Sequence, residues 1–342
     1  MIKKEICGQF QEKPVYKYTI NNKNGMKFSC ISHGATLTEI YALDKNNNPV
    51  NVLLGFNNLD YYLKDTKIFS AASIGRVAGR IEKGEFEIKG KRYKVESNEG
   101  ENLLHGGTHG FNSFNWESRI SESNNSVTFY NIIKEEEDGF PGNIEVKITY
   151  SLNDNNDLNI DFDASSDKDT LFNPTVHSYF NLSGNFENLL RNHTLQINSD
   201  YVEELRSDNI PTGKLKEVKE TPFDFREPKD LMKVVESFKK ELKLDGIDHP
   251  FKVNSKNIAT LISKDTGIRL DIESERNALI VYTLNACYDN FKMNGKSIAK
   301  HMAVALEPQT LPDAINHKGF GHIVLNADEK KHYNIKYHFS LA

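Results

Sequence analysis

Apolar and polar residues alternate along several short stretches of this chain. The clearest run is 144–152, where every second residue is apolar, and shorter runs follow at 158–162, 268–272 and 335–339. A period of two places successive side chains on opposite faces of an extended backbone. Each run therefore predicts a strand with one buried face.

Turn signals separate these runs. Residues 86–88 and 93–95 are joined around Lys89-Gly90, which predicts a hairpin. Asparagine tolerates positive φ, so asparagine-rich breaks predict more hairpin tips, at 21–25, 45–48, 124–125 and 153–156. Short strands joined by such turns favour antiparallel sheets.

Only one stretch argues strongly for a helix. Within 231–242, apolar residues fall on one helical face and lysines and glutamates on the other; the apolar positions are Leu231, Val234, Val235, Phe238 and Leu242. We expect this helix to pack on a sheet. Because no flexible linker or fixed-period repeat interrupts the chain, we predict an all-β fold with a few short helices. Residues 1–342 are expected to form one large, mainly antiparallel domain.

Composition narrows the class of protein. The 342 residues are 38% hydrophobic, and a net charge of −5 comes from 43 basic and 48 acidic side chains without a basic stripe. This pattern argues against a nucleic-acid partner, and no apolar stretch approaches the length of a membrane span. Three widely spaced cysteines, Cys7, Cys30 and Cys287, favour reduced thiols over disulfides. We expect a cytoplasmic protein.

The stretch 173–184 contains a candidate catalytic histidine, His177. Pro174 and Gly184 punctuate its ends, and aromatic residues follow the histidine, so the backbone is expected to be held in place. An imidazole held by packed neighbours can transfer a proton in a defined direction near neutral pH. From this stretch alone, a core histidine hydrogen-bonded to a carbonyl is the favoured interpretation.

A second histidine stretch, 102–110, is rich in glycine. Three glycines beside His105 and His109 let the backbone approach a ligand closely, which makes His105 a candidate site residue. The two histidines could also indicate a metal pair. The glycines argue against a helix that would align the rings, and no acidic or cysteine ligand lies nearby, so no metal is expected.

Two arginines, Arg76 and Arg80, lie among small residues in 73–81. Each guanidinium could hold a sugar hydroxyl or a carboxylate, and each could equally join a surface ion pair. The glycines around them are not followed by the Lys-Ser/Thr of a phosphate-binding loop and do not lie in a βαβ unit. A nucleotide cofactor is therefore not indicated.

Carboxylates complete the candidate set. Along 302–308 the pattern places Glu307 on the same strand face as two alanines, which leaves room for a ligand. Pro308 is expected to end the strand, so that Glu307 enters a cleft; the other interpretation is an edge glutamate facing water. Asp248 lies on a loop punctuated by Gly246 and Pro250 and by itself indicates an ordinary turn aspartate.

Five of these motifs together form a family pattern. In order and approximate spacing, the chain resembles the aldose 1-epimerase (galactose mutarotase) family from about residue 34 to its end; the matching motifs are 75–81, 104–107, 177–182, 248–249 and 306–309. The resemblance implies a large β-sandwich with a shallow sugar cleft. It also implies no metal and no cofactor, a monosaccharide such as galactose or glucose as substrate, and a monomer or homodimer.

The resemblance also implies residue roles. Glu307 would take the proton from the anomeric hydroxyl while His177 protonates the ring oxygen, and the opened aldehyde would rotate and close as the other anomer. His105, Arg80 and Asp248 would hold the sugar hydroxyls or help to polarise the ring oxygen. The residue types fit this chemistry, because ring opening needs one acid and one base. Each such group contributes about 10²–10⁴-fold to a rate.

The chain departs from the family pattern at two expected sugar contacts. Gly79 stands where relatives usually have an asparagine, and 284–286 reads Leu-Asn-Ala where Gly-Asn-Phe is usual. Gly79 and Asn285 are still expected to contact the substrate. The aromatic wall of the cleft is then absent or comes from Tyr288 or Phe291. Which hexose is preferred stays open.

Three alternatives keep the same scaffold or chemistry in other forms. A non-catalytic carbohydrate-binding domain would not need both Glu307 and His177. A hexose-phosphate epimerase would need several basic side chains converging on phosphate. A glycosidase would use Asp248 and Glu307 as its carboxylate pair and would leave His177 without a role.

Overall fold

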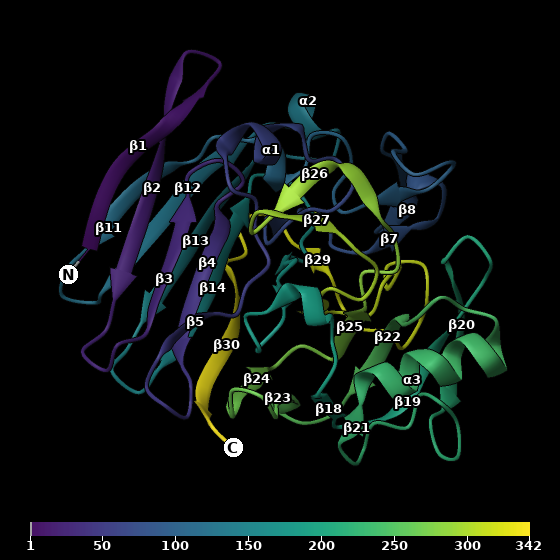
Figure 1. Cartoon of the computed structure of the whole chain (residues 1–342). Helices are drawn as coiled ribbons and strands as arrows, with labels where there is room; N and C mark the ends of the chain where they lie inside the picture. Colours follow the sequence, from purple (N-terminus) through teal and green to yellow (C-terminus); the bar gives the residue numbers. More distant parts are fainter. Residues whose placement is uncertain (1) are drawn as a thin grey trace.

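The computed structural model describes residues 2–342, apart from the side chains of residues 289 and 290. Antiparallel sheets make up most of the molecule (Figure 1). The five-stranded sheet runs β1 (Ile2–Phe10), β2 (Lys13–Asn21), β3 (Lys27–Ile31), β4 (Thr36–Leu43) and β5 (Pro49–Asn51). It is the purple sheet at the left of Figure 1, in front of teal strands of the next sheet.

Two larger sheets complete the framework. The nine-stranded sheet has the order β11 (Glu117–Ser121), β12 (Ser126–Ile133), β13 (Ile144–Leu152), β14 (Asp157–Ser166), β30 (Lys331–Leu341), β24 (Ile268–Ser274), β23 (Asn257–Ser263), β18 (His193–Ile197) and β21 (Lys229–Asp230). The six-stranded sheet has the order β17 (Tyr179–Phe180), β28 (Val304–Gln309), β25 (Ala278–Tyr282), β22 (Asp248–Val253), β19 (Ser199–Leu205) and β20 (Pro211–Glu217).

Short ladders and turns fill the rest. The two-stranded pairs are β6 (Ser73–Ile74) with β16 (Thr175–Val176), β7 (Arg80–Ile81) with β10 (Leu103–Leu104), β8 (Glu85–Ile88) with β9 (Lys91–Lys94), β15 (Thr170–Leu171) with β29 (Val324–Leu325), and β26 (Tyr288–Met293) with β27 (Lys296–Ile298). The α-helices are α1 (Leu59–Lys64), α2 (Glu135–Asp138) and α3 (Leu231–Ser237). Single helical turns lie at Glu82–Gly84, Phe111–Ser113, Phe186–Asn188 and Phe238–Leu242. Among the residues described, no helix has the length and apolarity that a membrane crossing requires.

The alternating runs form strands as the pattern predicts. In β13, buried and more exposed side chains alternate along the whole strand, and β14 and β24 alternate in the same way. In β30 the alternation covers the predicted run, from Ile335 to Phe339. The predicted hairpin is β8–β9, in which Phe86 lies opposite Tyr93. The predicted all-β antiparallel sandwich is therefore confirmed.

The predicted helix is present, but its regular α-helical part, α3, ends at Ser237 and a π-helical turn follows. Asp230 caps α3 by accepting hydrogen bonds from the backbone N–H groups of Met232 and Lys233. Four of the five apolar positions are buried, whereas Leu242, in the following π-helical turn, is 36% exposed.

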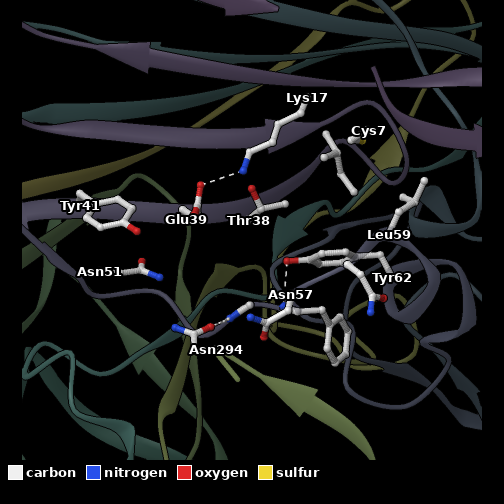
Figure 2. A pocket seen from close by; sticks show the side chains of 14 residues that line it. Cys7, Lys17, Thr38, Glu39, Tyr41, Asn51, Asn57, Leu59, Tyr62 and Asn294 are labelled. Carbon is white, nitrogen blue, oxygen red and sulfur yellow. Dashed lines mark hydrogen bonds and ion pairs between the residues drawn. The ribbon is translucent and has the colours of Figure 1, made fainter. Parts of the chain in front are cut away.

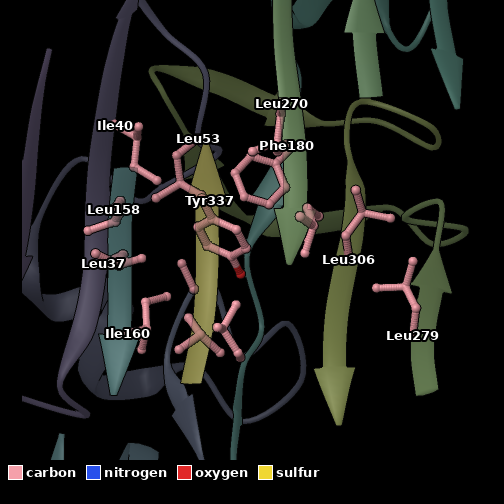
Figure 3. Packing of buried hydrophobic residues seen from close by; sticks show 14 of the residues in the cluster. Leu37, Ile40, Leu53, Leu158, Ile160, Phe180, Leu270, Leu279, Leu306 and Tyr337 are labelled. Carbon is pink, nitrogen blue, oxygen red and sulfur yellow. The ribbon is translucent and has the colours of Figure 1, made fainter. Parts of the chain in front are cut away.

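The sandwich core joins all three large sheets. Tyr18 of β2 packs edge-on against Phe129 of β12, with ring centroids 5.8 Å apart. On the other side, Phe180 of β17 meets Tyr337 of β30 at 5.1 Å. Figure 3 shows this packing, in which side chains of β4, β14, β28 and β30 share one hydrophobic cluster. The backbone of β17 and β28 is consequently held by core packing on one face, which leaves the other face to carry the site.

Candidate active site

A pocket of about 260 Å³ opens beside the six-stranded sheet. It is lined by residues from sheet strands and from loops that are far apart in the sequence. Six of the seven predicted site residues line it: Gly79, Arg80, His105, His177, Asp248 and Glu307. The fold thus brings together the separate sequence motifs at one place.

Glu307 reaches the pocket from the middle of β28, not from a strand end. Leu306 faces the core, so its neighbour Glu307 faces the pocket and is only 1% exposed. The expectation that Pro308 ends the strand is wrong, because Pro308 pairs with Leu279 of β25 and the strand continues. Strand β17 pairs with β28 only at Val304 and Ala305, so no strand on that side requires the missing N–H of Pro308.

His177 lies in the short connection between β16 and β17. Its backbone N–H donates to the carbonyl of Ala72, and its carbonyl accepts from the N–H of Ala71, both at 3.0 Å. These bonds aim the imidazole into the pocket, where Nε2 lies 3.4 Å from Oε1 of Glu307. An acid and a base are therefore placed side by side in a site that excludes most water.

Burial shifts the pKa values of His177 and Glu307 in opposite directions. Burial lowers the pKa of His177 to about 4. Burial, and then the charge of Asp248, raises the pKa of Glu307 well above its ordinary value, although Arg80 opposes this shift. Between the lowered pKa of His177 and the raised pKa of Glu307 the pair holds one exchangeable proton, either as carboxylic acid with neutral imidazole or as carboxylate with imidazolium.

The glycine-rich turn after β10 positions His105. His105 itself has a left-handed backbone, with φ +53°, and Gly106 follows with φ +84°. A Cβ on Gly106 would overlap the carbonyl oxygen of Gly75, so only glycine fits there. The N–H of Gly79 donates to Nδ1 of His105 at 3.2 Å. The proton of the neutral ring is therefore on Nε2, which makes His105 a hydrogen-bond donor.

The same side chains could be read as metal ligands. One potential ligand atom each from His105, His177 and Glu307 lies within 4.8 Å of the others. However, Nδ1 of His105 already accepts a hydrogen bond from the N–H of Gly79. A metal on Nε2 would displace the ring proton to Nδ1, and that hydrogen bond would then have to break. His109, the other histidine considered, is exposed and is not part of this cluster. The donor set fits a hydrogen-bonding ligand better than a metal ion.

Arg80 and Asp248 add charge to the pocket. Arg80 forms two parallel hydrogen bonds to Glu99, at 2.6 and 2.8 Å. Burial lowers the pKa of Arg80, but this pairing together with the charges of Asp248 and Glu307 raises it above its ordinary value. Burial raises the pKa of Asp248, which the charge of Arg80 partly offsets. Both residues line the pocket, and their charges act on the pKa of Glu307. They offer the pocket a hydrogen-bond donor and an acceptor.

Arg76 and Asn285 do not line the pocket and bond to other parts of the protein instead. Arg76 is fully buried and holds Asp138 through two hydrogen bonds, at 2.6 and 2.9 Å, outside the pocket. Asn285, predicted as a sugar contact, does not line the pocket. Its amide nitrogen donates to the carbonyl of Ile247 at 2.8 Å, immediately before Asp248. Asn285 therefore holds the backbone just before Asp248. Asp248 itself is not in a loop, as the sequence suggested, but is the first residue of β22 and pairs with Tyr282 of β25.

Several aromatic side chains form the pocket wall. Phe69 stacks on His177 with centroids 6.2 Å apart, and Tyr282 and Tyr288 line the pocket with it. Of the two candidates for the aromatic wall, Tyr288 therefore lines the pocket. Phe291 packs instead against other aromatic rings of the neighbouring cluster. Phe69 carried no sequence signal, because it lies in a loop.

Gln309 is a pocket residue that sequence reasoning missed. It is fully buried and lines the pocket, and within the described part of the chain neither atom of its amide has a hydrogen-bond partner. Buried amides without partners are uncommon and call for an explanation such as an absent ligand. The period of two was the available signal, because Gln309 lies two residues after Glu307 on the same strand face.

The fold and site define a β-sandwich protein with a buried acid/base pair among hydrogen-bonding side chains. The chain belongs to the aldose 1-epimerase family, whose family model matches residues 16–338. An aldose 1-epimerase of Streptococcus thermophilus is 38% identical, covering 98% of this chain and 97% of that protein. A maltose epimerase of Levilactobacillus brevis is 35% identical over 99% of each chain. The solved structure of a galactose 1-epimerase from Lactobacillus acidophilus superposes with a TM-score of 0.89 at 28% identity, over 100% of this chain and 99% of that one.

Proposed function

We propose that this protein is an aldose 1-epimerase that interconverts the α and β anomers of a free hexose such as galactose or glucose. The observation that supports this most strongly is the 3.4 Å approach of His177 Nε2 to Glu307 Oε1 inside a pocket. The names of the similar proteins, an aldose 1-epimerase and a galactose 1-epimerase, support the same activity.

The proposed reaction uses the two groups on two oxygens of one carbon. The carboxylate of Glu307 removes the proton of the anomeric hydroxyl, and the bond from the anomeric carbon to the ring oxygen breaks. The ring oxygen takes a proton from the imidazolium of His177. The open-chain aldehyde then rotates about its C1–C2 bond. Ring closure reverses both proton transfers and returns each group to its starting state.

The protons balance without exchange with solvent. The ionic pair, Glu307 carboxylate with His177 imidazolium, becomes the neutral pair when the ring opens. Burial raises the pKa of Glu307 and lowers that of His177, so it favours the neutral pair. The environment thereby stabilises the state in which the sugar ring is open, and the charge of Arg80 helps to retain the carboxylate before reaction.

The remaining pocket residues are proposed to bind the sugar. The Nε2–H of His105 and the guanidinium of Arg80 donate to sugar oxygens, and Asp248 accepts from a hydroxyl. The unpartnered amide of Gln309 supplies one further hydrogen bond. Gly79 lines the pocket with its backbone, and a Cβ at this position would crowd the ring of Pro312 at 3.1 Å.

The charges of the pocket favour a neutral sugar over a sugar phosphate. The cationic side chains among its lining residues are Lys67 and Arg80, and Arg80 is already paired with Glu99. Arg76 is paired with Asp138 elsewhere.

A cytoplasmic location is also proposed, since all three cysteines are free thiols. Whether the protein is a monomer or a homodimer stays a prediction.

Polarimetry tests the activity directly. Freshly dissolved α-D-galactose, α-D-glucose and maltose approach their equilibrium rotation slowly in buffer. Maltose belongs in the panel because one relative is named a maltose epimerase. We expect the protein to accelerate the change for at least one of these sugars in proportion to enzyme concentration. Rates equal to those in buffer for all three would contradict the proposal.

A further inference from the structure

A second and larger cavity, of about 530 Å³, lies away from the acid/base pair. Figure 2 shows side chains of the five-stranded sheet and of the segment around α1 facing this common space. None of the seven predicted site residues lines it, and it is about twice the volume of the first pocket. It is therefore a separate site with room for a ligand at least as large.

Thr38 offers a hydroxyl to this cavity that the protein does not use. Thr38 on β4 is 7% exposed, and within the described part of the chain its Oγ1 has no hydrogen-bond partner. A buried hydroxyl without a partner is costly unless something else bonds to it. In Figure 2 this oxygen lies beside the ion pair of Lys17 and Glu39.

Lys17 and Glu39 cancel each other's charge in the wall. Lys17 Nζ lies 2.9 Å from Glu39 Oε2, and both side chains are about 30% exposed. Burial acts to raise the pKa of Glu39, but the hydrogen bond and charge of Lys17 hold it below its ordinary value. Glu39 is thus ionised at neutral pH. Because the pair leaves the lining without net charge, the cavity suits a neutral ligand better than an anion.

Two asparagines present oriented donors to the same space. Oδ1 of Asn51 accepts from the backbone N–H of Ile40 at 3.2 Å, and Oδ1 of Asn57 accepts from that of Gly295 at 2.6 Å. These bonds fix which end of each amide faces outward. The Nδ2 groups are consequently preorganised to donate, and the hydroxyl of Tyr41 adds a further polar group to the lining.

This combination matches a polyhydroxylated molecule. Hydroxyl groups of a sugar can donate to Glu39, accept from amide nitrogens and exchange hydrogen bonds with Thr38, while aromatic rings pack on its apolar faces. The lining includes one carboxylate and, among the residues described, no histidine. It therefore lacks the acid/base pair that ring opening needs.

We propose that this cavity is a second, non-catalytic binding site for a neutral mono- or disaccharide. The proposal does not depend on the catalytic activity of the first pocket. Binding at the two sites can be followed separately, because Ile31 lines the second cavity and Ile280 lines the acid/base pocket.

The test is a titration of isoleucine-methyl-labelled full-length protein with galactose and with maltose, followed by NMR. The variants Ile31→Val and Ile280→Val assign the two methyl resonances. We expect the Ile31 resonance to shift with a saturation curve of its own, different from that of Ile280, for at least one sugar. An Ile31 resonance that does not shift with either sugar, or that follows the Ile280 curve, would overturn the proposal.

Variants localise the binding. Thr38→Val should fold normally, since Oγ1 makes no hydrogen bond within the protein, and should weaken the Ile31 curve by about five-fold, as expected for one lost hydrogen bond. Tyr41→Phe should also weaken it, whereas the Ile280 curve stays unchanged. Tyr16→Phe is the matched control, because a lysine amine lies about 4 Å from each tyrosine ring and Tyr16 does not line the cavity. An unchanged Ile31 curve in Thr38→Val and Tyr41→Phe would overturn the proposal.

Discussion

At the scale of single residues, burial is the main influence on the protonation of both Glu307 and His177. Neither residue type alone defines a function, and the sequence around His177 by itself favours a core histidine. The structure places the two side chains in contact, and the same burial acts on both in opposite directions. The pair therefore carries one exchangeable proton between the lowered pKa of His177 and the raised pKa of Glu307.

This shared proton predicts a bell-shaped pH dependence of kcat/KM. Below a pH of about 4, His177 takes up a second proton while Glu307 is still protonated, so no base is available and activity falls. Above the raised pKa of Glu307 the pair loses its proton, so no acid is available and activity falls again. Polarimetric initial rates across this range check the profile. An acid limb near the ordinary histidine pKa of about 6.5 would contradict it.

Residue positions were predictable from the sequence only where a motif carried them. Gly79, Arg80, His105 and Asp248 line the pocket. They were predicted to do so because the family resemblance includes the motifs that contain them. Asn285 was expected there on the same resemblance, yet its amide bonds to a loop carbonyl. Phe69 lies in a loop and has no local signal of chemistry, and Gln309 is indicated only by its position two residues after Glu307 on the same strand face. Only the fold brings an ordinary phenylalanine and glutamine to the site.

At the scale of elements, the turn after β10 shows how backbone shape sets side-chain chemistry. Gly106 allows this turn to lie against Gly75, and the turn then holds His105 where Gly79 can donate to its ring. The three glycines of this stretch were visible in the sequence, and their use for close backbone approach was predicted. Which backbone they approach depends on the pairing of β7 with β10 and could not be predicted.

Gly106→Ala should therefore destabilise the protein more than a glycine substitution in open space. Gly90→Ala, in the β8–β9 turn, is the matched control: its φ of +81° is close to the +84° of Gly106, and no atom lies within 4 Å of an added Cβ. Both variants pay for the positive φ. Gly106→Ala should lose about 1–3 kcal/mol more, from overpacking. Urea denaturation measures the difference, and equal losses would show that the overlap is not real.

Strand boundaries were predicted less well than strands. Alternation located β13, β14, β24 and β30, because burial on one face is a strong local constraint. Pro308 led to a false strand end, since the rule that proline stops a ladder holds only where a neighbouring strand needs the N–H. That condition depends on distant segments.

At the scale of the whole molecule, the site exists because strands distant in sequence pair. Strand β30, from the end of the chain, lies between β14 and β24, and β17 lies beside β28. Such nonlocal pairings leave no periodic signal, so the order of strands could not be predicted. One hydrophobic cluster takes in residues from Tyr18 to Phe339. We propose on this basis that the chain folds as one domain.

A single domain should unfold in one cooperative step. The chain has one tryptophan, Trp116, which is 2% exposed and belongs to the main cluster. Its fluorescence therefore reports on the core, while far-ultraviolet circular dichroism reports on all sheets. We expect the two signals to give coincident denaturation curves. Two separated transitions would show instead that part of the sheet framework folds independently.

Polarimetric rates of two single variants, Glu307→Gln and His177→Asn, measured against the wild-type protein, test whether these side chains act as the acid/base pair. Each variant should lose about 10²–10⁴-fold in kcat, because each removes one partner of the pair. Glu307→Gln should remain folded, since it replaces a buried carboxyl by a neutral amide of the same shape. Rates near that of the wild type in either folded variant would contradict the account.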